Sequence, residues 1–325
     1  MDVTVAIITY NHANYIAQAI ESVLPQEVDF EYELLIGDDG SDDGTSDIVR
    51  EYESRYPDKI RAFYHDRSKV IYVKGRPTAK YNYLNNLRHA RGKYVALLDG
   101  DDYWTSNNKL QVQRDILEQD RQCSICFHPV EIVASDGTHL NIAYPPRKKS
   151  FYDIYDLIPD NFVHTSSVVF RHDREFVFPD WFYQISFGDW AQHLMRATGG
   201  NLAYVDEVMS AYRIHGQGRW SNYKSVQKIR ESIEVLEFFN QHTNKLHDDQ
   251  IQTAIQRMDF NLILKYLDAG EHDNARKHLK KLTEQLGNKR RISTLDYLYI
   301  RLCTYFPLVN RLLTGPLKAS RKFIT

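Results

Sequence analysis

The sequence is poor in cysteine and in long apolar runs. Its 325 residues include three cysteines, Cys123, Cys126 and Cys303, too few for a disulfide framework and typical of a reducing compartment. No uninterrupted apolar stretch approaches the roughly 20 residues that a membrane-spanning helix requires. The start, MDVTVAIITYN, lacks the basic, apolar and small-residue order of a signal peptide. We therefore expect a cytoplasmic protein.

An excess of positive charge is also missing. The formal net charge is −2 and the pI is about 6.7, which excludes the global basic field that attracts nucleic acid. Hydrophobic residues make up 42% and charged residues 26%, a balance typical of a folded globular chain. We expect no nucleic-acid partner, and the length allows one large domain and a smaller one.

The first hundred residues alternate between strand and helix patterns. Short apolar runs predict buried strands, and apolar residues at helical spacing follow each of them. The predicted strands are 3–9, 32–37, 60–64 and 94–98, and the predicted helices are 15–24, 45–56 and 81–89, with a basic loop over 65–79. Thr45 or Ser46 is expected to cap the second helix. Repeated strand–helix–strand units indicate a parallel, doubly wound α/β sheet. Ligands of such sheets bind outside the carboxyl ends of the strands.

The pattern changes twice further along the chain. Shorter strands are predicted over 123–127, 131–134, 166–170 and 202–205, with a helix near 190–198. From about residue 221 onward the pattern is helical, with a helical hairpin that turns at 269–271. The sequence therefore predicts a domain over 1–220 and a C-terminal helical region over 221–325.

Four aspartates and three glycines follow the second predicted strand, in LLIGDDGSDDGT (residues 34–45). The helix-loop-helix calcium pattern fails because Arg50 stands where a bidentate Glu is required and because a strand precedes the loop. A phosphate loop is disfavoured because the acids would repel a pyrophosphate. An acid at a strand end can instead accept a hydrogen bond from a ribose hydroxyl or a base N–H.

A second acidic cluster ends the fourth strand, in LLDGDDYW (residues 97–104), with Asp99, Asp101 and Asp102. Acids at this density repel one another and cost desolvation energy unless a cation or donor groups satisfy them. Carboxylates that hold Mg²⁺ or Mn²⁺, which bridges diphosphate oxygens, are the simplest interpretation. The alternative is a solvated acidic turn that caps the following helix. Two acidic strand ends in one parallel sheet favour a metal site over a solvated turn.

Taken in order, these segments resemble the family 2 glycosyltransferases of the GT-A fold. The resemblance covers roughly residues 1–222 and is carried by Thr9-Tyr10-Asn11, GDDGSDDGT, LLDGDDYW with Lys109-Leu110, FHPV, the Asp189 region and YRIHGQGRWS. It implies a Rossmann-like, mostly parallel central sheet with flanking helices, followed by the C-terminal helical region. It also implies a nucleotide-diphosphate sugar donor, a divalent metal (Mn²⁺ or Mg²⁺) and inversion at the anomeric carbon.

At single positions, the resemblance implies three sets of residues. The nucleotide-sugar set is Thr9, Tyr10, Asn11, Asp38, Asp39, Lys80, Asn82, Asp99, Gly100, Asp101, Arg219 and Trp220. Asp39 would hold the nucleoside, with Asp38 as the second choice, whereas the loop before Lys80 and Asn82 departs from the commonest family spacing. The metal ligands would be Asp101, Asp102 and His215.

The third set is one catalytic residue, Asp189. Gly188 stands where many relatives have the first acid of a Glu-Asp pair, but Asp189 keeps the place of the catalytic base. An inverting transfer needs one carboxylate to take the proton of the acceptor hydroxyl. An Asp at this position could also cap the helix that follows, and both roles are compatible.

The expected activity is hexosyl or N-acetylhexosaminyl transfer, with a UDP-sugar favoured, to a saccharide or lipid-linked acceptor in bacterial surface polysaccharide synthesis. A sugar-phosphate nucleotidyltransferase would carry a Gly-rich basic loop where TYNHANY stands, and an inactive binding scaffold would not need the retained acids. Residues 297–325 are apolar and basic, which suits peripheral contact with the inner face of the cytoplasmic membrane. Packing of this segment on the catalytic domain and homo-oligomerisation remain open.

Overall fold

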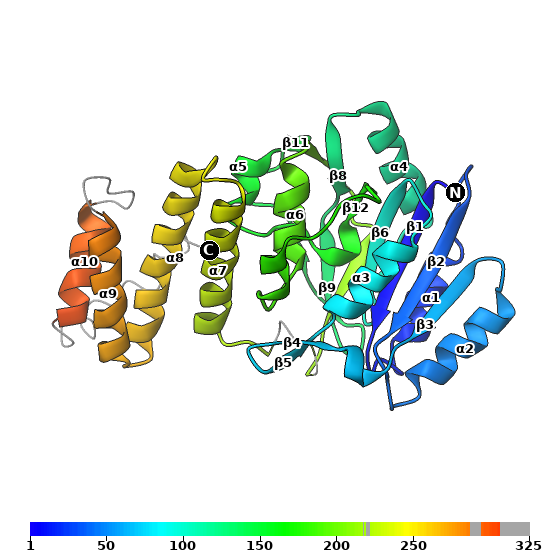
Figure 1. The fold of residues 1–325 in the computed structure, drawn as a ribbon, viewed down its shortest axis with the longest axis horizontal. Coiled ribbons are helices and arrows are strands. Elements are labelled where there is room, and N and C mark those ends of the chain that lie inside the picture. The colour runs from blue at the N-terminus through cyan, green and yellow to red at the C-terminus, as the bar shows by residue number, and fades with distance from the viewer. Residues whose placement is uncertain (217, 219–221, 287–293, 306–325) are drawn as a thin grey trace. The chain divides into compact units, whose positions relative to one another are not determined.

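The computed structural model describes residues 1–216, 218, 222–286 and 294–305 (Figure 1). The chain divides into two compact units, residues 1–222 and 223–325, so the division falls close to the boundary expected near 220. Among the described residues, no helix is both long and apolar enough to cross a membrane.

A mixed sheet of eight strands forms the centre of the first unit. In spatial order the strands are β11 (Phe151–Tyr152), β13 (Asn201–Tyr204), β8 (Cys123–Phe127), β12 (Val169–Arg171), β6 (Tyr94–Asp99), β1 (Val3–Thr9), β2 (Tyr32–Asp38) and β3 (Ile60–Tyr64). Strands β6, β1, β2 and β3 are parallel neighbours and run side by side in Figure 1. Their register pairs Ile8 with Asp99 and Thr9 with Asp38, so the polar segments after these strands share one edge.

Burial explains why these segments are strands and helices. All seven residues of β2 are buried, as expected for a parallel strand covered on both faces. The helix α1 (Ile16–Val23) buries Ile16, Ala19, Ile20 and Val23, which recur at the spacing of one helical face. The predicted α/β sheet with flanking helices is therefore confirmed.

Four details of the first unit differ from the prediction. The helix α2 (Thr45–Arg55) is preceded by Gly44 in a left-handed conformation (φ 99°), not capped by a Thr45 or Ser46 side chain. The basic stretch 65–79 is not only a loop, since it holds the hairpin of β4 (Ile71–Val73) and β5 (Arg76–Thr78). The strand predicted over 166–170 begins only at Val169, after a 3₁₀ turn. The helix α6 (Asp189–Ala197) begins at Asp189, with Gly188 at the cap position.

A second, four-stranded sheet was not anticipated as a unit. Its order is β10 (His139–Ala143), β9 (Val130–Ala134), β14 (Ser210–Ile214) and β7 (Tyr103–Trp104). Strand β14 was not predicted, yet it pairs with β7, which directly follows the acidic end of β6. This pairing brings His215 to that acidic end.

The second unit is helical, as predicted. Its helices are α7 (Ser225–His242), α8 (Asp248–Asp268), α9 (His272–Leu286) and α10 (Thr294–Tyr305). The predicted hairpin turn lies between α8 and α9, where Gly270 takes a φ of 74° that favours glycine. Leu262, Leu279 and Ile300 belong to one apolar core within this unit.

Candidate functional site

The loops that follow β1, β2 and β6 are bonded to one another. The amide of Asp39 donates to the carbonyl of Thr9 at 2.9 Å, and the amide of Gly100 donates to the carbonyl of Ile8 at 2.9 Å. A Cβ at position 100 would lie 2.6 Å from the Thr9 hydroxyl oxygen, so this close approach requires glycine. The predicted site residues of three separate strand ends therefore meet at one place.

Two of the four aspartates in GDDGSDDGT hold this loop arrangement. The side chain of Asn11, at a φ of 55°, donates to Asp42 at 2.9 Å and accepts from the Asp42 amide at 3.0 Å. Asp43 accepts from the amide of Ala13 at 3.0 Å. These acids stabilise the turn after β1.

Asp38 and Asp39 have different surroundings. Asp38 is buried, and its carboxylate accepts from the amide and hydroxyl of Ser41 at 3.2 and 2.5 Å and from the hydroxyl of Ser46. Asp39 pairs with Arg67 at 3.2 Å through Oδ2, whereas its buried Oδ1 has no hydrogen-bond partner among the described residues. Of the two carboxylates predicted to hold a nucleoside, Asp39 has an acceptor atom to offer.

Tyr10, Asp39 and Arg67 together form a small cradle. The Arg67 guanidinium lies 4.1 Å from the centroid of the Tyr10 ring, which is 40% exposed. Burial raises the pKa of Asp39 to about 6, although the charge of Arg67 opposes the shift. We call these three residues the nucleoside cradle. An aromatic face, a carboxylate and a guanidinium are the groups that a planar base with N–H and C=O edges can use.

Asp101 is the centre of a second group. Its Oδ2 lies 2.8 Å from Nε2 of His215 and 3.9 Å from Nε2 of His12. Burial would raise the pKa of Asp101, but the hydrogen bond from His215 and the nearby imidazoles lower it below its usual value. One ligand atom from each of His12, Asp101 and His215 lies within 4.8 Å of the others. We call these residues the His–Asp–His cluster.

Asp102 lies outside the His–Asp–His cluster. It is buried and accepts from the backbone amide of Arg213 at 2.8 Å, while the Arg213 side chain donates to the Asp101 carbonyl at 2.9 Å. Burial raises the pKa of Asp102 well above its usual value, and the charges of Asp101 and Asp99 add to the shift. Its contacts attach the acidic turn to β14, and its role as a metal ligand stays a prediction.

Asp99 and Asp189 face the same site from different elements. Burial raises the pKa of Asp99 to about 8, and the charges of Asp101 and Asp189 add to the shift. Asp189 is the first residue of α6, and Asn161 donates to its Oδ2 at 2.9 Å. Burial also raises the pKa of Asp189. The predicted base thus lies close enough to the acidic end of β6 for the two charges to interact.

Lys80 and Asn82 have structural partners. Lys80 is buried and donates through Nζ to the carbonyl of Ile185 at 2.6 Å, just before α6. Asn82 is fully buried in α3 (Lys80–His89) and donates to the carbonyl of Gly37 at 2.7 Å. Their contact with a donor stays a prediction. Arg219 and Trp220, the other predicted donor-binding residues, lie outside the described residues.

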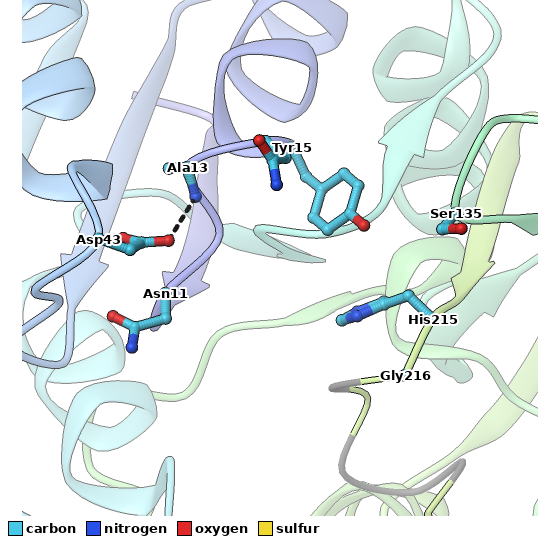
Figure 2. A pocket seen from close by; sticks show the side chains of 8 residues that line it. Asn11, Ala13, Tyr15, Asp43, Ser135, His215 and Gly216 are labelled. Carbon is cyan, nitrogen blue, oxygen red and sulfur yellow. Dashed lines mark hydrogen bonds between the residues drawn. The ribbon is translucent and has the colours of Figure 1, made fainter.

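A pocket of about 470 Å³ opens beside the His–Asp–His cluster. Figure 2 shows Asn11, Ala13 and Asp43 along one wall and Ser135, His215 and Gly216 along the other. The ring of Tyr15 lies 5.2 Å from that of His215, centroid to centroid. A ligand that reaches His215 therefore has room on this side of the cluster.

The sequence prediction missed His12 and Asn161 and did not assign Arg67 to the nucleoside. His12 directly follows the quoted Thr9-Tyr10-Asn11 segment, so its position was the available signal. Arg67 belongs to the basic stretch, but nothing in the sequence pairs it with Asp39. For Asn161, whose partner Asp189 is 28 residues away in the chain, no signal was available.

The mostly parallel α/β sheet with acidic strand ends agrees with the resemblance to glycosyltransferases of the GT-A fold. The model of the family described as "Glycosyl transferase family 2" matches residues 4–176, just over half of the chain. The chain belongs to this family.

Individual relatives agree with this assignment. The Mycobacterium tuberculosis protein Rv1520 is 34% identical over 227 residues, which span 69% of this chain and 62% of that protein. The chain thus matches about three-fifths of the length of this relative. The putative teichuronic acid biosynthesis glycosyltransferase TuaG of Bacillus subtilis is 29% identical over 72% of this chain and 90% of its own length.

Solved structures show the same fold. S. aureus TarS 1–349 in complex with UDP-GlcNAc superposes with a TM-score of 0.56 at 18% identity, covering 87% of this chain and 92% of that chain. The mannosyltransferase PcManGT from Pyrobaculum calidifontis, in complex with GDP-Man and Mn²⁺, has a TM-score of 0.52 at 16% identity, with 94% and 87% covered. These likenesses support the fold and no finer assignment.

Proposed function

We propose that the protein is an inverting, metal-dependent transferase that moves a hexosyl or N-acetylhexosaminyl group from a UDP-sugar to a hydroxyl of a saccharide or lipid-linked acceptor. The observation that carries the proposal is the bonding of the loops after β1, β2 and β6 to one another through the amides of Asp39 and Gly100. It supports one donor site at the acidic end of β6, and the charge of Asp189 acts on Asp99 from the start of α6. The product class, a surface polysaccharide, is supported by relatives such as TuaG, whose name assigns it to teichuronic acid biosynthesis.

The nucleoside cradle supports the choice of uridine. Uracil presents an N–H between two carbonyl oxygens, and this order matches the acceptor Oδ1 of Asp39 beside the guanidinium of Arg67. Cytosine has an acceptor nitrogen at the same place, which a charged Asp39 would repel. The exposed ring of Tyr10 offers a face for stacking.

The His–Asp–His cluster supports the choice of a divalent metal. A carboxylate oxygen of Asp101 and Nε2 of His215, 2.8 Å apart, suit Mn²⁺, and Asp101 alone would suit Mg²⁺. When bound, such an ion stabilises the negative charge that develops on the leaving diphosphate. Asp101 and His215 would hold it, and Asp102 keeps the acidic turn on β14.

Asp189 supports the inverting step. A general base works best when its pKa lies near the working pH, and burial raises the pKa of Asp189 toward that range. Asn161 donates to Oδ2 at 2.9 Å and so fixes the side chain. The Asp189 carboxylate would then accept the proton of the acceptor hydroxyl. As that proton leaves, the acceptor oxygen attacks the anomeric carbon from the face opposite the diphosphate.

The proposal is tested by nucleotide binding and by transfer in two variants. The panel consists of UDP, GDP, CDP and dTDP and their common sugar conjugates, each with and without Mn²⁺, and the readout is the melting temperature. We expect a Mn²⁺-dependent rise with UDP compounds, because a ligand at ~100 times its dissociation constant adds roughly 2.7 kcal/mol to the free energy of unfolding. No rise with any compound would favour the inactive scaffold.

The variants separate binding from chemistry. Asp101→Ala should abolish the Mn²⁺-dependent rise. Asp189→Asn should keep it but lose transfer, or donor hydrolysis if no acceptor is found, by on the order of 10²-fold or more. Near-normal turnover in Asp189→Asn would show that another group is the base.

A further inference from the structure

We propose that His12 is a third protein ligand of the metal, together with Asp101 and His215, and that Thr9 orients its ring. This inference rests on the metal site of the proposed function. It goes beyond that function because neither the acidic motif nor the His215 segment points to His12. It assigns a role to a residue of the loop after β1.

The spacing of the ligand atoms is close to that of one coordination sphere. Two donor atoms that each lie ~2.1 Å from the same ion are separated by roughly 3 to 4 Å. The Nε2 atoms of His215 and His12 lie 2.8 and 3.9 Å from the same carboxylate oxygen of Asp101. The second distance is too long for a hydrogen bond, so His12 points at Asp101 without bonding to it directly. An ion between them would bond to both.

The two imidazoles approach Asp101 from independent elements. His12 follows β1 and His215 follows β14, and their rings are edge to face, with centroids 6.2 Å apart and planes at 89°. This arrangement directs both Nε2 atoms toward one carboxylate without ring overlap. A pair of histidines that only packed together would not need to share a carboxylate oxygen.

Thr9 gives His12 a second contact that suits a metal ligand. Its hydroxyl oxygen lies 3.2 Å from Nδ1 of His12. When the hydroxyl accepts from Nδ1–H, Nε2 keeps the lone pair that a metal requires. Thr9 is itself fixed, since it is buried and its carbonyl accepts from the amide of Asp39. Thr9 is therefore a positioning residue.

A third ligand of this type changes the metal that the site prefers. Carboxylates suit Mg²⁺ and Mn²⁺ alike, whereas imidazole nitrogen favours the first-row transition ions over Mg²⁺. A site with two imidazoles and one carboxylate should therefore select Mn²⁺ over Mg²⁺. Without His12, this preference should weaken.

The test measures Mn²⁺ binding by electron paramagnetic resonance on the full chain, with the metal alone and with UDP, so that transfer activity is not needed. The variants are His12→Gln, Thr9→Val, His215→Gln, the double variant His12→Gln with His215→Gln, and Asp101→Ala. The matched control is His89→Gln, an exposed histidine of α3 whose Nδ1 lies 2.9 Å from the carbonyl oxygen of Asn85 in its own helix. Melting temperatures without metal check that each variant is folded.

We expect imidazole nitrogen couplings to Mn²⁺ in the wild type that are reduced in His12→Gln and absent when both histidines are replaced. His12→Gln should weaken Mn²⁺ binding on the order of tenfold or more and let Mg²⁺ displace Mn²⁺ more readily. Thr9→Val should have a smaller effect in the same direction.

Unchanged affinity and couplings in a folded His12→Gln variant would overturn the role of His12. The proposed function would still stand if Asp101→Ala lost the metal. Normal Mn²⁺ binding in Asp101→Ala would overturn both.

Discussion

At the scale of single residues, Asp39 couples nucleotide binding to pH. Burial raises its pKa to about 6, so the carboxylate is charged at pH 7.5 and loses its charge as the pH falls through 6. The N–H of the base needs an unprotonated acceptor oxygen, and both carboxylate oxygens of Asp39 are unprotonated only in the charged form. At pH 5 about one-tenth of the carboxylate is ionised. We therefore expect the dissociation constant of uridine, measured calorimetrically without metal, to rise ~10-fold from pH 7.5 to pH 5.

The control for this prediction is Asp39→Asn. The variant should bind uridine more weakly than the wild type at pH 7.5 and show little change down to pH 5. Uridine has no phosphate group that titrates in this range. Pairing of Asp39 with Arg67 at 3.2 Å acts against the shift, so a wild-type affinity that does not vary with pH would mean that this ion pair outweighs burial.

At the scale of elements, the helix α4 (Lys109–Gln119) begins with a fully buried lysine. Lys109 donates to Gln113 at 2.6 Å and lies 4.3 Å from the centroid of the Trp104 ring. Burial lowers its pKa from 10.5 to about 7. Above pH 7 the unfolded chain therefore binds more protons at this site than the folded one. The contribution of Lys109 to stability should rise with pH until it levels off near 10.5.

This prediction is checked by comparing the wild type with Lys109→Met. The difference in free energy of unfolding between the two, from urea denaturation, should shift by about 2–3 kcal/mol in favour of the wild type between pH 7 and pH 9. Lys265→Met serves as the control, because this lysine is exposed in α8. A difference that stays constant across this range would show that Lys109 is charged in the folded protein.

The elements also show what could be predicted from the sequence and what could not. Buried strands such as β1 and β2 are continuous apolar runs, and their acidic ends are read directly from the chain. Strand β14 is short and carries Arg213 in its interior, so it has no comparable apolar run. The bond between Asp101 and His215 spans 114 residues and depends on that strand. The resemblance to the family assigned His215 to the metal, whereas its bond to Asp101 through β14 and the approach of His12 to the same carboxylate required the packed structure.

At the scale of the whole molecule, a net charge of −2 conceals a basic surface in the helical unit. A groove of about 400 Å³ there is lined by Arg276, Lys277, Lys280 and Arg301, with Tyr297 and Tyr305 beside them. Part of the segment expected to contact membrane, residues 297–305, lies in α10 at this groove, while 306–325 lie outside the described residues. Clustered cations near aromatic side chains are typical of surfaces that bind anionic lipid headgroups.

We therefore predict that the full chain sediments with vesicles that contain anionic lipid and not with neutral ones. The triple variant Arg276→Gln, Lys277→Gln, Lys280→Gln should lose on the order of 1 kcal/mol of binding free energy per removed charge, and salt should weaken the wild type because exposed charges are screened. The matched control removes the same charge from other exposed positions of this unit, Lys245, Arg257 and Lys265. Equal loss in both triple variants would mean that net charge, not the groove, draws the protein to lipid. Binding that survives both would assign the contact to another surface.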